Sequence, residues 1–170
     1  MSGLKNAKGD VGMLRNSYKK RIAAGEMVLG SEFKMSFLGQ NQLLEVMVRT
    51  TQTPEYKRQE VEDFGPMGMG INQQGPLINK GQITVTCVED LNGSVMEFVR
   101  DCVVNKKHVD IELQQTPESL GGSAPDALIH KMFDCTIGSE AVDLSTEDNT
   151  VLVKPSLLIN YNWAEPESGR

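Results

Sequence analysis

Residues 81–115 constrain the fold most, because they contain signals for a strand, a helix and a second strand in quick succession. Ser94 stands three residues before Glu97, which is the spacing of a capping box and predicts a helix start there. Asn105 is expected to end this helix. Apolar residues at every second position predict half-buried strands on both sides of it: Ile83, Val85 and Cys87 before, and Val109, Ile111 and Leu113 after.

The helix expected in this stretch has one apolar face. Its apolar residues recur with helical spacing and are Val95, Phe98, Val99, Cys102 and Val103. We expect these five side chains to pack the helix against a sheet. One helix flanking a mainly β framework is therefore the predicted core of the fold.

Further strands are predicted where apolar and polar residues alternate, at residues 33–37, 44–48, 129–137 and 151–163. The first two are interpreted as a hairpin that turns at residues 39–41. In the third, His130 falls among the residues expected to face outward. The chain is therefore expected to be mainly β, with at least six strands in one domain.

The first 25 residues are basic, although the chain as a whole has a formal net charge of −6. Asp10 is a suitable N-cap, and a sparse apolar stripe predicts a short helix ending near Ala24, after a mobile arm over residues 1–9. This basic segment is either a solvated helix face or a docking element for an acidic neighbour. The acidic remainder argues against a cationic cleft for nucleic acid.

Residues 53–81 contain three prolines and little periodicity, so we expect an irregular connection here, with residues 56–64 as an extended arm. Met67 and Met69 on such a flexible segment would form an adaptable contact surface.

The sequence favours no chemistry. Cys87, Cys102 and Cys135 are an odd number and lie in apolar patterns, so we expect buried, reduced thiols. His108 and His130 lack partners at metal-ligand spacing. We therefore expect no catalytic residue, no cofactor and no metal site, and an enzyme is the weaker class. No apolar run is long enough to predict a membrane span, and no signal-peptide core is present.

Three segments, taken in order, resemble a known family: Phe-Leu-Gly-Gln-Asn at residues 37–41, the strand and helix of residues 83–98, and Leu-Leu-Ile-Asn-Tyr-Asn-Trp at residues 157–163. Over about residues 25–165 the chain is similar to the tail tube proteins of contractile-tailed, T-even-like bacteriophages, to which the tubes of R-type pyocins and type VI secretion are related. The resemblance implies a two-sheet, barrel-like β-sandwich with one flanking helix. Residues 1–24 would then be an arm with a short helix, residues 25–165 the tube domain, and residues 166–170 a tail.

The resemblance also implies a structural role in a virion tail, assembled in the cytoplasm of a bacterial host. Six copies would form a ring, and rings would stack into a channel for genome ejection. The implied partners are the chain itself, the sheath, the baseplate and tail-terminator proteins, and DNA in transit, which an acidic wall would repel. The contact candidates are Arg15, Lys19, Lys20, Tyr56, Lys57, Arg58, Phe64, Met67 and Met69. The alternatives are a tailocin or secretion tube that carries no DNA, and a monomeric β-sandwich binding module or hydrolase.

Overall fold

The computed structural model describes residues 9–166 of the chain. The arm expected over residues 1–9 and the tail expected over residues 166–170 lie outside the described residues except for residues 9 and 166. The chain divides into two compact units, Met1–Gly30 and Ser31–Arg170. Each unit is described by itself below.

The first unit contains helix α1 (Val11–Ala23), which confirms the short N-terminal helix. The Asp10 carboxylate accepts a hydrogen bond from the backbone N–H of Met13 at 3.1 Å, so Asp10 caps the helix start. At the other end, the Arg21 guanidinium donates to the carbonyl oxygen of Gly25 at 2.9 Å. No side chain of α1 is buried.

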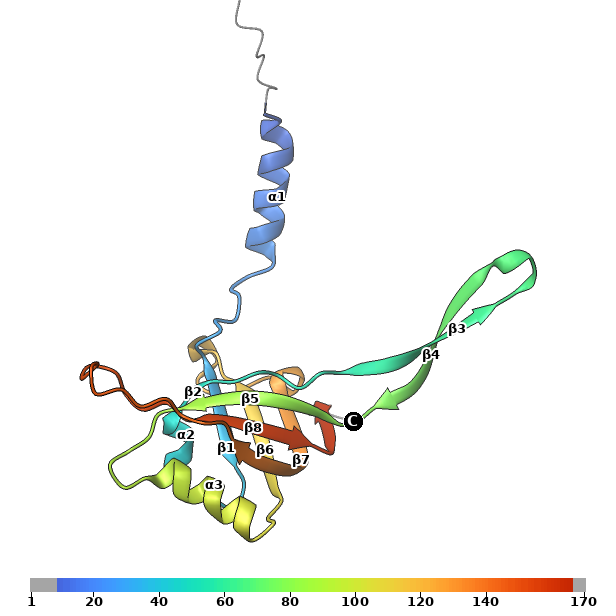
Figure 1. The fold of residues 1–170 in the computed structure, drawn as a ribbon. Helices are drawn as coiled ribbons and strands as arrows, with labels where there is room; N and C mark the ends of the chain where they lie inside the picture. Colours follow the sequence, from blue (N-terminus) through green and yellow to red (C-terminus); the bar gives the residue numbers. More distant parts are fainter. Residues whose placement is uncertain (1–8, 167–170) are drawn as a thin grey trace, which may run out of the picture. The chain divides into compact units, whose positions relative to one another are not determined.

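The second unit is mainly β, as predicted, and its strands pair antiparallel throughout (Figure 1). One sheet of seven strands runs in the order β1-β6-β7-β8-β5-β2, with β9 also paired to β7, and curls into a barrel-like sandwich. Its strands are β1 (Phe33–Phe37), β2 (Val48–Thr50), β5 (Gly81–Cys87), β6 (Val109–Gln115), β7 (Ile129–Ser139), β8 (Ser156–Tyr161) and β9 (Trp163–Pro166). Three short 3-10 turns lie at Pro66–Gly68, Glu118–Leu120 and Asp126–Leu128.

Strand β7 joins the two layers and contains a β-bulge. Ile111 pairs with Met132 but Val109 pairs with Cys135, so β7 has one extra residue here. Asp134 adopts a left-handed conformation with φ of 51°, and its N–H donates to the Asp110 carboxylate at 3.0 Å. An extra residue reverses which side chains face inward. The expectation that His130 faces outward is therefore wrong, because the bulge turns this part of β7 over and buries it.

The core lies between the two layers and under helix α3 (Ser94–Val104). The Phe37 and Phe98 rings meet edge to face at 5.2 Å between centroids. Four of the five residues expected to pack α3 on the sheet are buried: Val95, Phe98, Val99 and Cys102. Val103 is not part of this contact and is 58% exposed. At 100° per residue it lies about 90° from the centre of the buried face.

The expected capping box at the start of α3 is wrong. Glu89 accepts from the N–H groups of Val95 and Met96, both at 2.9 Å, so its carboxylate spans the first turn. Asp90 accepts from the N–H of Ser94 at 2.9 Å and from its hydroxyl at 2.7 Å. Because two carboxylates already satisfy these N–H groups, Ser94 acts as a donor rather than as the cap.

Residues 43–47 form a short helix, α2 (Leu43–Met47), and not the expected strand. The Asn41 side chain accepts from the N–H of Leu43 at 3.0 Å and turns the chain. Leu44 and Val48 are buried while Val46 is exposed. The same apolar residues fit helical spacing, and the partner of β1 is β6 instead of a neighbouring hairpin strand.

Residues 57–78 form a hairpin, so the expectation of an irregular connection is wrong, whereas the extended arm expected over residues 56–64 is confirmed for residues 57–64. Within residues 9–166, strands β3 (Lys57–Phe64) and β4 (Gly70–Ile78) pair only with each other, and we call them the arm hairpin (Figure 1). A bulge lies where the register shifts between Arg58 and Glu60. A Cβ on Gly75 would lie 2.8 Å from the carbonyl oxygen of Gln59, so the strands approach here as only glycine permits.

The final strand is shorter than expected and divided. Residues 151–155 are not in a strand, β8 begins at Ser156, and Asn162 separates β8 from β9. Trp163 therefore belongs to β9, where it pairs with Phe133, and its side chain is 42% exposed.

Candidate functional site

The arm hairpin exposes its side chains on both faces. All eight residues of β3 are exposed, and three apolar residues gather at the tip: Phe64, Met67 and Met69. Met67 adopts a left-handed conformation with φ of 64° in the turn and is fully exposed. A two-stranded hairpin alone is marginally stable in water. The arm hairpin therefore has the properties of a contact element that a partner surface would complete.

The root of the arm hairpin is held to the sheet by two tyrosines. The Tyr56 hydroxyl and Nδ1 of His130 lie 2.9 Å apart, and the N–H of Glu55 donates to the Tyr161 hydroxyl at 3.1 Å. A Cβ on Gly81 would lie 2.2 Å from that hydroxyl oxygen, so Gly81 leaves the space that Tyr161 fills. Burial raises the pKa of Tyr56 to about 12 and lowers the pKa of His130. Both groups are therefore neutral near pH 7.

The two basic candidates beside this root make contacts within the hairpin region. Lys57 forms an ion pair with Glu55, and the Arg58 guanidinium donates to the carbonyl oxygen of Gly75 at 3.3 Å. The hydrogen bond to Glu55 and its charge raise the pKa of Lys57. Tyr56, Lys57 and Arg58 were all expected to be contact residues, and Tyr56, which also holds the root through His130, remains 47% exposed.

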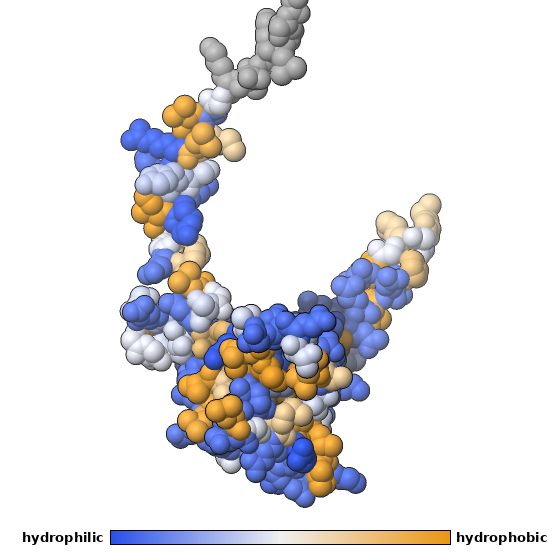
Figure 2. Space-filling model, turned by 60° about the vertical axis from the view of Figure 1, so that its left-hand side comes forward, coloured by the Kyte–Doolittle hydropathy of each residue, from blue (hydrophilic) through white to orange (hydrophobic). Residues whose placement is uncertain are grey.

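The other three basic candidates, Arg15, Lys19 and Lys20, lie on α1 in the first unit. Hydrophobic and hydrophilic residues alternate on the surface of this helix (Figure 2). The apolar stripe that predicted the helix is exposed rather than packed: Val11, Leu14, Tyr18 and Ile22 are each more than 60% exposed.

A second exposed apolar segment was not identified from the sequence. Residues 140–155 connect β7 to β8, and we call residues 140–153 of this connection the acidic loop. Leu144, Val151 and Leu152 are each more than 60% exposed there, and a pocket of about 200 Å³ lies among them. The apolar run at residues 151–153 was the sequence signal for this exposed segment, but it was interpreted as the beginning of a buried strand. The connection carries four carboxylates, Glu140, Asp143, Glu147 and Asp148, and one basic residue, Lys154, which directly follows the apolar run.

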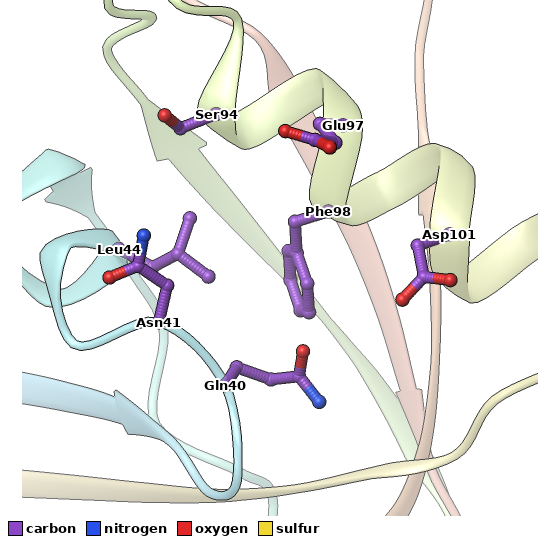
Figure 3. A pocket seen from close by; sticks show the side chains of 7 residues that line it. All are labelled: Gln40, Asn41, Leu44, Ser94, Glu97, Phe98 and Asp101. Carbon is purple, nitrogen blue, oxygen red and sulfur yellow. The ribbon is translucent and has the colours of Figure 1, made fainter.

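A pocket of about 220 Å³ lies between α3 and the turn after β1. The Phe98 ring points from α3 toward Gln40 (Figure 3). Of the polar groups that line it, Ser94 donates to Asp90, and Asp101 accepts from Lys107 at 2.6 Å. The Lys107 and Asn105 hydrogen bonds lower the pKa of Asp101. These groups stabilise the two ends of α3 and do not form an acid–base or nucleophile–base pair.

The three thiols are free and buried. Burial, followed by nearby carboxylates, raises the pKa of Cys87 to about 11 and that of Cys135 to about 12. Burial raises the pKa of Cys102 as well. Thiols with raised pKa values are weak nucleophiles at neutral pH.

Within residues 9–166 no three His, Cys, Asp or Glu side chains are grouped to hold a metal ion. No helix in this described part is long and apolar enough to cross a membrane.

No protein-family model matches the sequence, and no curated protein matches it either. Solved structures do match the fold. A chain in the PVC sheath/tube terminator, part of an extracellular contractile injection system, has a TM-score of 0.65 at 9% identity, over 84% of this chain and 98% of that chain. A chain in the PVC sheath–tube complex has a TM-score of 0.63 at 10% identity, over 88% and 97%.

A third match comes from the tail of an empty gene transfer agent particle, determined with C6 symmetry. Its TM-score is 0.53 at 11% identity, over 85% of this chain and all of that chain. At this low identity the similarity establishes the fold. The chain has the fold of chains from contractile injection systems and a particle tail, which confirms the resemblance to tail tube proteins at the level of fold.

Proposed function

We propose that the chain is a structural subunit of the tube in a contractile, phage-derived tail. Six copies form a ring, rings stack into a tube, and the tube carries cargo through its channel. The observation that carries this proposal is the combination of a tube-type fold with an arm hairpin that is exposed on both faces. The C6 symmetry of the gene transfer agent tail supports six copies per ring.

The edges of the sheet support assembly as well. Among the described residues, strand β1 pairs only with β6 and leaves its other edge open, whereas the opposite edge strand, β2, is only three residues long, which limits pairing there. The open edge of β1 favours pairing with another chain. A heterologous contact between identical copies closes into a ring or continues as a filament, and either arrangement would cover this edge.

The arm hairpin is proposed to contact a neighbouring copy through Phe64, Met67 and Met69. Apolar residues at the free end of an arm that is fixed at its root can reach a second chain while the fold of the first is unchanged. Lys57, Arg58, Arg15, Lys19 and Lys20 are proposed as contacts of the same assembly or of its sheath.

The particle would be a virion tail assembled in the cytoplasm of its bacterial host, with sheath, baseplate and terminator proteins as partners. If the cargo is DNA, the net negative charge of the chain lets it pass without binding. A tube terminator is the second candidate, favoured by the TM-score of 0.65 to a chain in the PVC sheath/tube terminator. A terminator would form a single ring and would not stack.

Deletion of residues 64–71 tests the proposal, with light scattering after size exclusion as the measurement. We expect the wild type to form rings or longer assemblies and the deletion variant to remain smaller at equal concentration, with unchanged circular dichroism. The control is Met67→Leu, which keeps the apolar tip and should assemble normally. A wild type that stays monomeric at every concentration would favour the binding-module alternative, and loss of circular dichroism on deletion would show that the tip is part of the core.

A further inference from the structure

We propose that helix α1 of one copy binds the acidic loop, residues 140–153, of a second copy of this chain. This inference rests on the self-assembly proposed above and names the partner of its basic helix. Neither surface is covered within the described chain, since no α1 side chain is buried and the loop exposes Leu144, Val151 and Leu152.

The two surfaces are complementary in charge. From the Asp10 cap to Gly25 the helix carries four basic residues, and its only acid is that cap. The acidic loop carries four carboxylates, and the single base of the connection between β7 and β8 is Lys154, directly after the loop. Opposite charge steers association and fixes orientation, while like charge excludes wrong partners.

The two surfaces also match in their apolar content. At 100° per residue, Val11, Leu14, Tyr18 and Ile22 fall within one stripe of α1. Arg15 and Lys19 lie along one flank of that stripe, and Arg21 lies along the other. The pocket in the loop is lined by Leu144, Val151 and Leu152 together with Asp143 and Asp148. An apolar stripe bordered by cations therefore faces an apolar pocket bordered by carboxylates.

The arm hairpin is the weaker receptor for α1. Its carboxylates Glu60, Glu62 and Asp63 share the same strand with Lys57 and Arg58, so its charge is mixed. A helix of 13 residues is marginal in water by itself, so α1 gains stability from a partner surface. Each copy offers one helix and one loop, which gives a head-to-tail contact that repeats through an assembly.

Cysteine cross-linking between copies tests this contact, because the native thiols are buried. Leu14→Cys in one preparation and Leu152→Cys in another are mixed as full-length chains and oxidised mildly. We expect a disulfide-linked dimer in the mixture and much less in either preparation alone. The control pairs Leu14→Cys with Leu91→Cys, which lies just before α3, is more exposed than Leu152 and should not cross-link.

Charge reversal makes the test specific. Arg15→Glu with Lys19→Glu should lower the cross-linking yield at least about tenfold, as should Asp143→Lys with Glu147→Lys in the partner. Combining both reversed chains should restore the yield. Lys20→Glu is the matched control, because Lys20 lies opposite the apolar stripe and its reversal should leave the yield unchanged.

Two results would overturn the proposal. One is a chain carrying both cysteines that closes its disulfide within itself at every concentration, which would mean that α1 binds its own loop. The other is normal ring or tube formation with no cross-link and no effect of charge reversal. That result would assign α1 to another partner such as the sheath while leaving the proposed function intact, whereas absence of any assembly would count against the proposed function itself.

Discussion

The Tyr56 hydroxyl lies 2.9 Å from Nδ1 of His130, a residue 74 positions further along the chain. This contact joins the start of the arm hairpin to the buried part of β7, and the two rings lie tilted at 5.8 Å between centroids. His130 is buried because the bulge at Asp134 turns β7 over. The backbone irregularity of one strand therefore determines where the arm hairpin is anchored.

This anchor predicts a loss of stability in mild acid. Burial lowers the pKa of His130 in the folded state below its ordinary value of 6.5. As the pH falls, His130 therefore takes up a proton in the unfolded chain before it does so in the folded protein. The contribution of neutral His130 to the free energy of unfolding is fully present above about pH 6.5, and it is lost as the pH falls from there toward the folded-state pKa. Chemical denaturation between pH 7.5 and 5 measures it. His130→Gln should flatten this dependence, and an equal slope in the wild type and the variant would contradict the assignment.

Gly81→Ala should destabilise the fold. The added Cβ would lie 2.2 Å from the Tyr161 hydroxyl oxygen, so the ring must move and its hydrogen bond with Glu55 is lost. Overpacking of this kind costs about 1–3 kcal/mol of unfolding free energy, measured by urea denaturation. Gly138→Ala is the control, because nothing lies within 4 Å of its Cβ position. Equal effects of the two substitutions would show that Tyr161 does not fill the space beside Gly81.

The start of α3 should depend on Glu89 and not on Glu97. Glu89→Gln weakens the charge-assisted hydrogen bonds to Val95 and Met96 and should cost about 1 kcal/mol. Glu97→Gln should change the unfolding free energy by less than about 0.5 kcal/mol. Thermal melts followed by circular dichroism measure both. The opposite ranking would support the capping box that the sequence suggested.

The packed face of α3 is tested by two valines four residues apart. Val99→Asp puts an unpaired charge into the core and should cost at least about 3 kcal/mol, enough to unfold a marginal domain. Val103→Asp changes an exposed residue near the helix end, where an added acid costs less than about 1 kcal/mol. The comparison is made on expression and melting temperature, and similar behaviour of the two would refute the assigned face.

Much of the fold follows from periodicity alone. The strands around residues 83–87 and 109–113 and the helix between them were predictable because each has a single side facing the core. Helix α1 was predictable from its Asp10 cap and its apolar stripe, although no side chain of it is buried. Val103 was misplaced because an apolar residue at the edge of a helical face satisfies the same spacing as one at its centre. Residues 43–47 were misassigned because their apolar positions fit both the two-residue period of a strand and the 3.6-residue period of a helix.

The predictions that were wrong concern features that depend on distant contacts or on local polar groups. The bulge at Asp134 arises from pairing with β6, and the sequence of β7 by itself continues the alternation through it. The arm hairpin lacked a periodic signal because neither of its faces meets the core. Of the interaction surfaces, the tip methionines and the basic helix were predictable from composition. The acidic loop was not, because Val151 and Leu152 imitate the start of a strand.

The central claim is that this chain assembles into rings of a tail tube, and electron microscopy of the purified protein tests it most directly. Negative-stain images are collected across a range of concentrations, with and without addition of a preformed tube end to nucleate growth. The account predicts six-fold rings or stacked hollow tubes in the class averages. Single globular particles under all of these conditions, nucleated samples included, would contradict it.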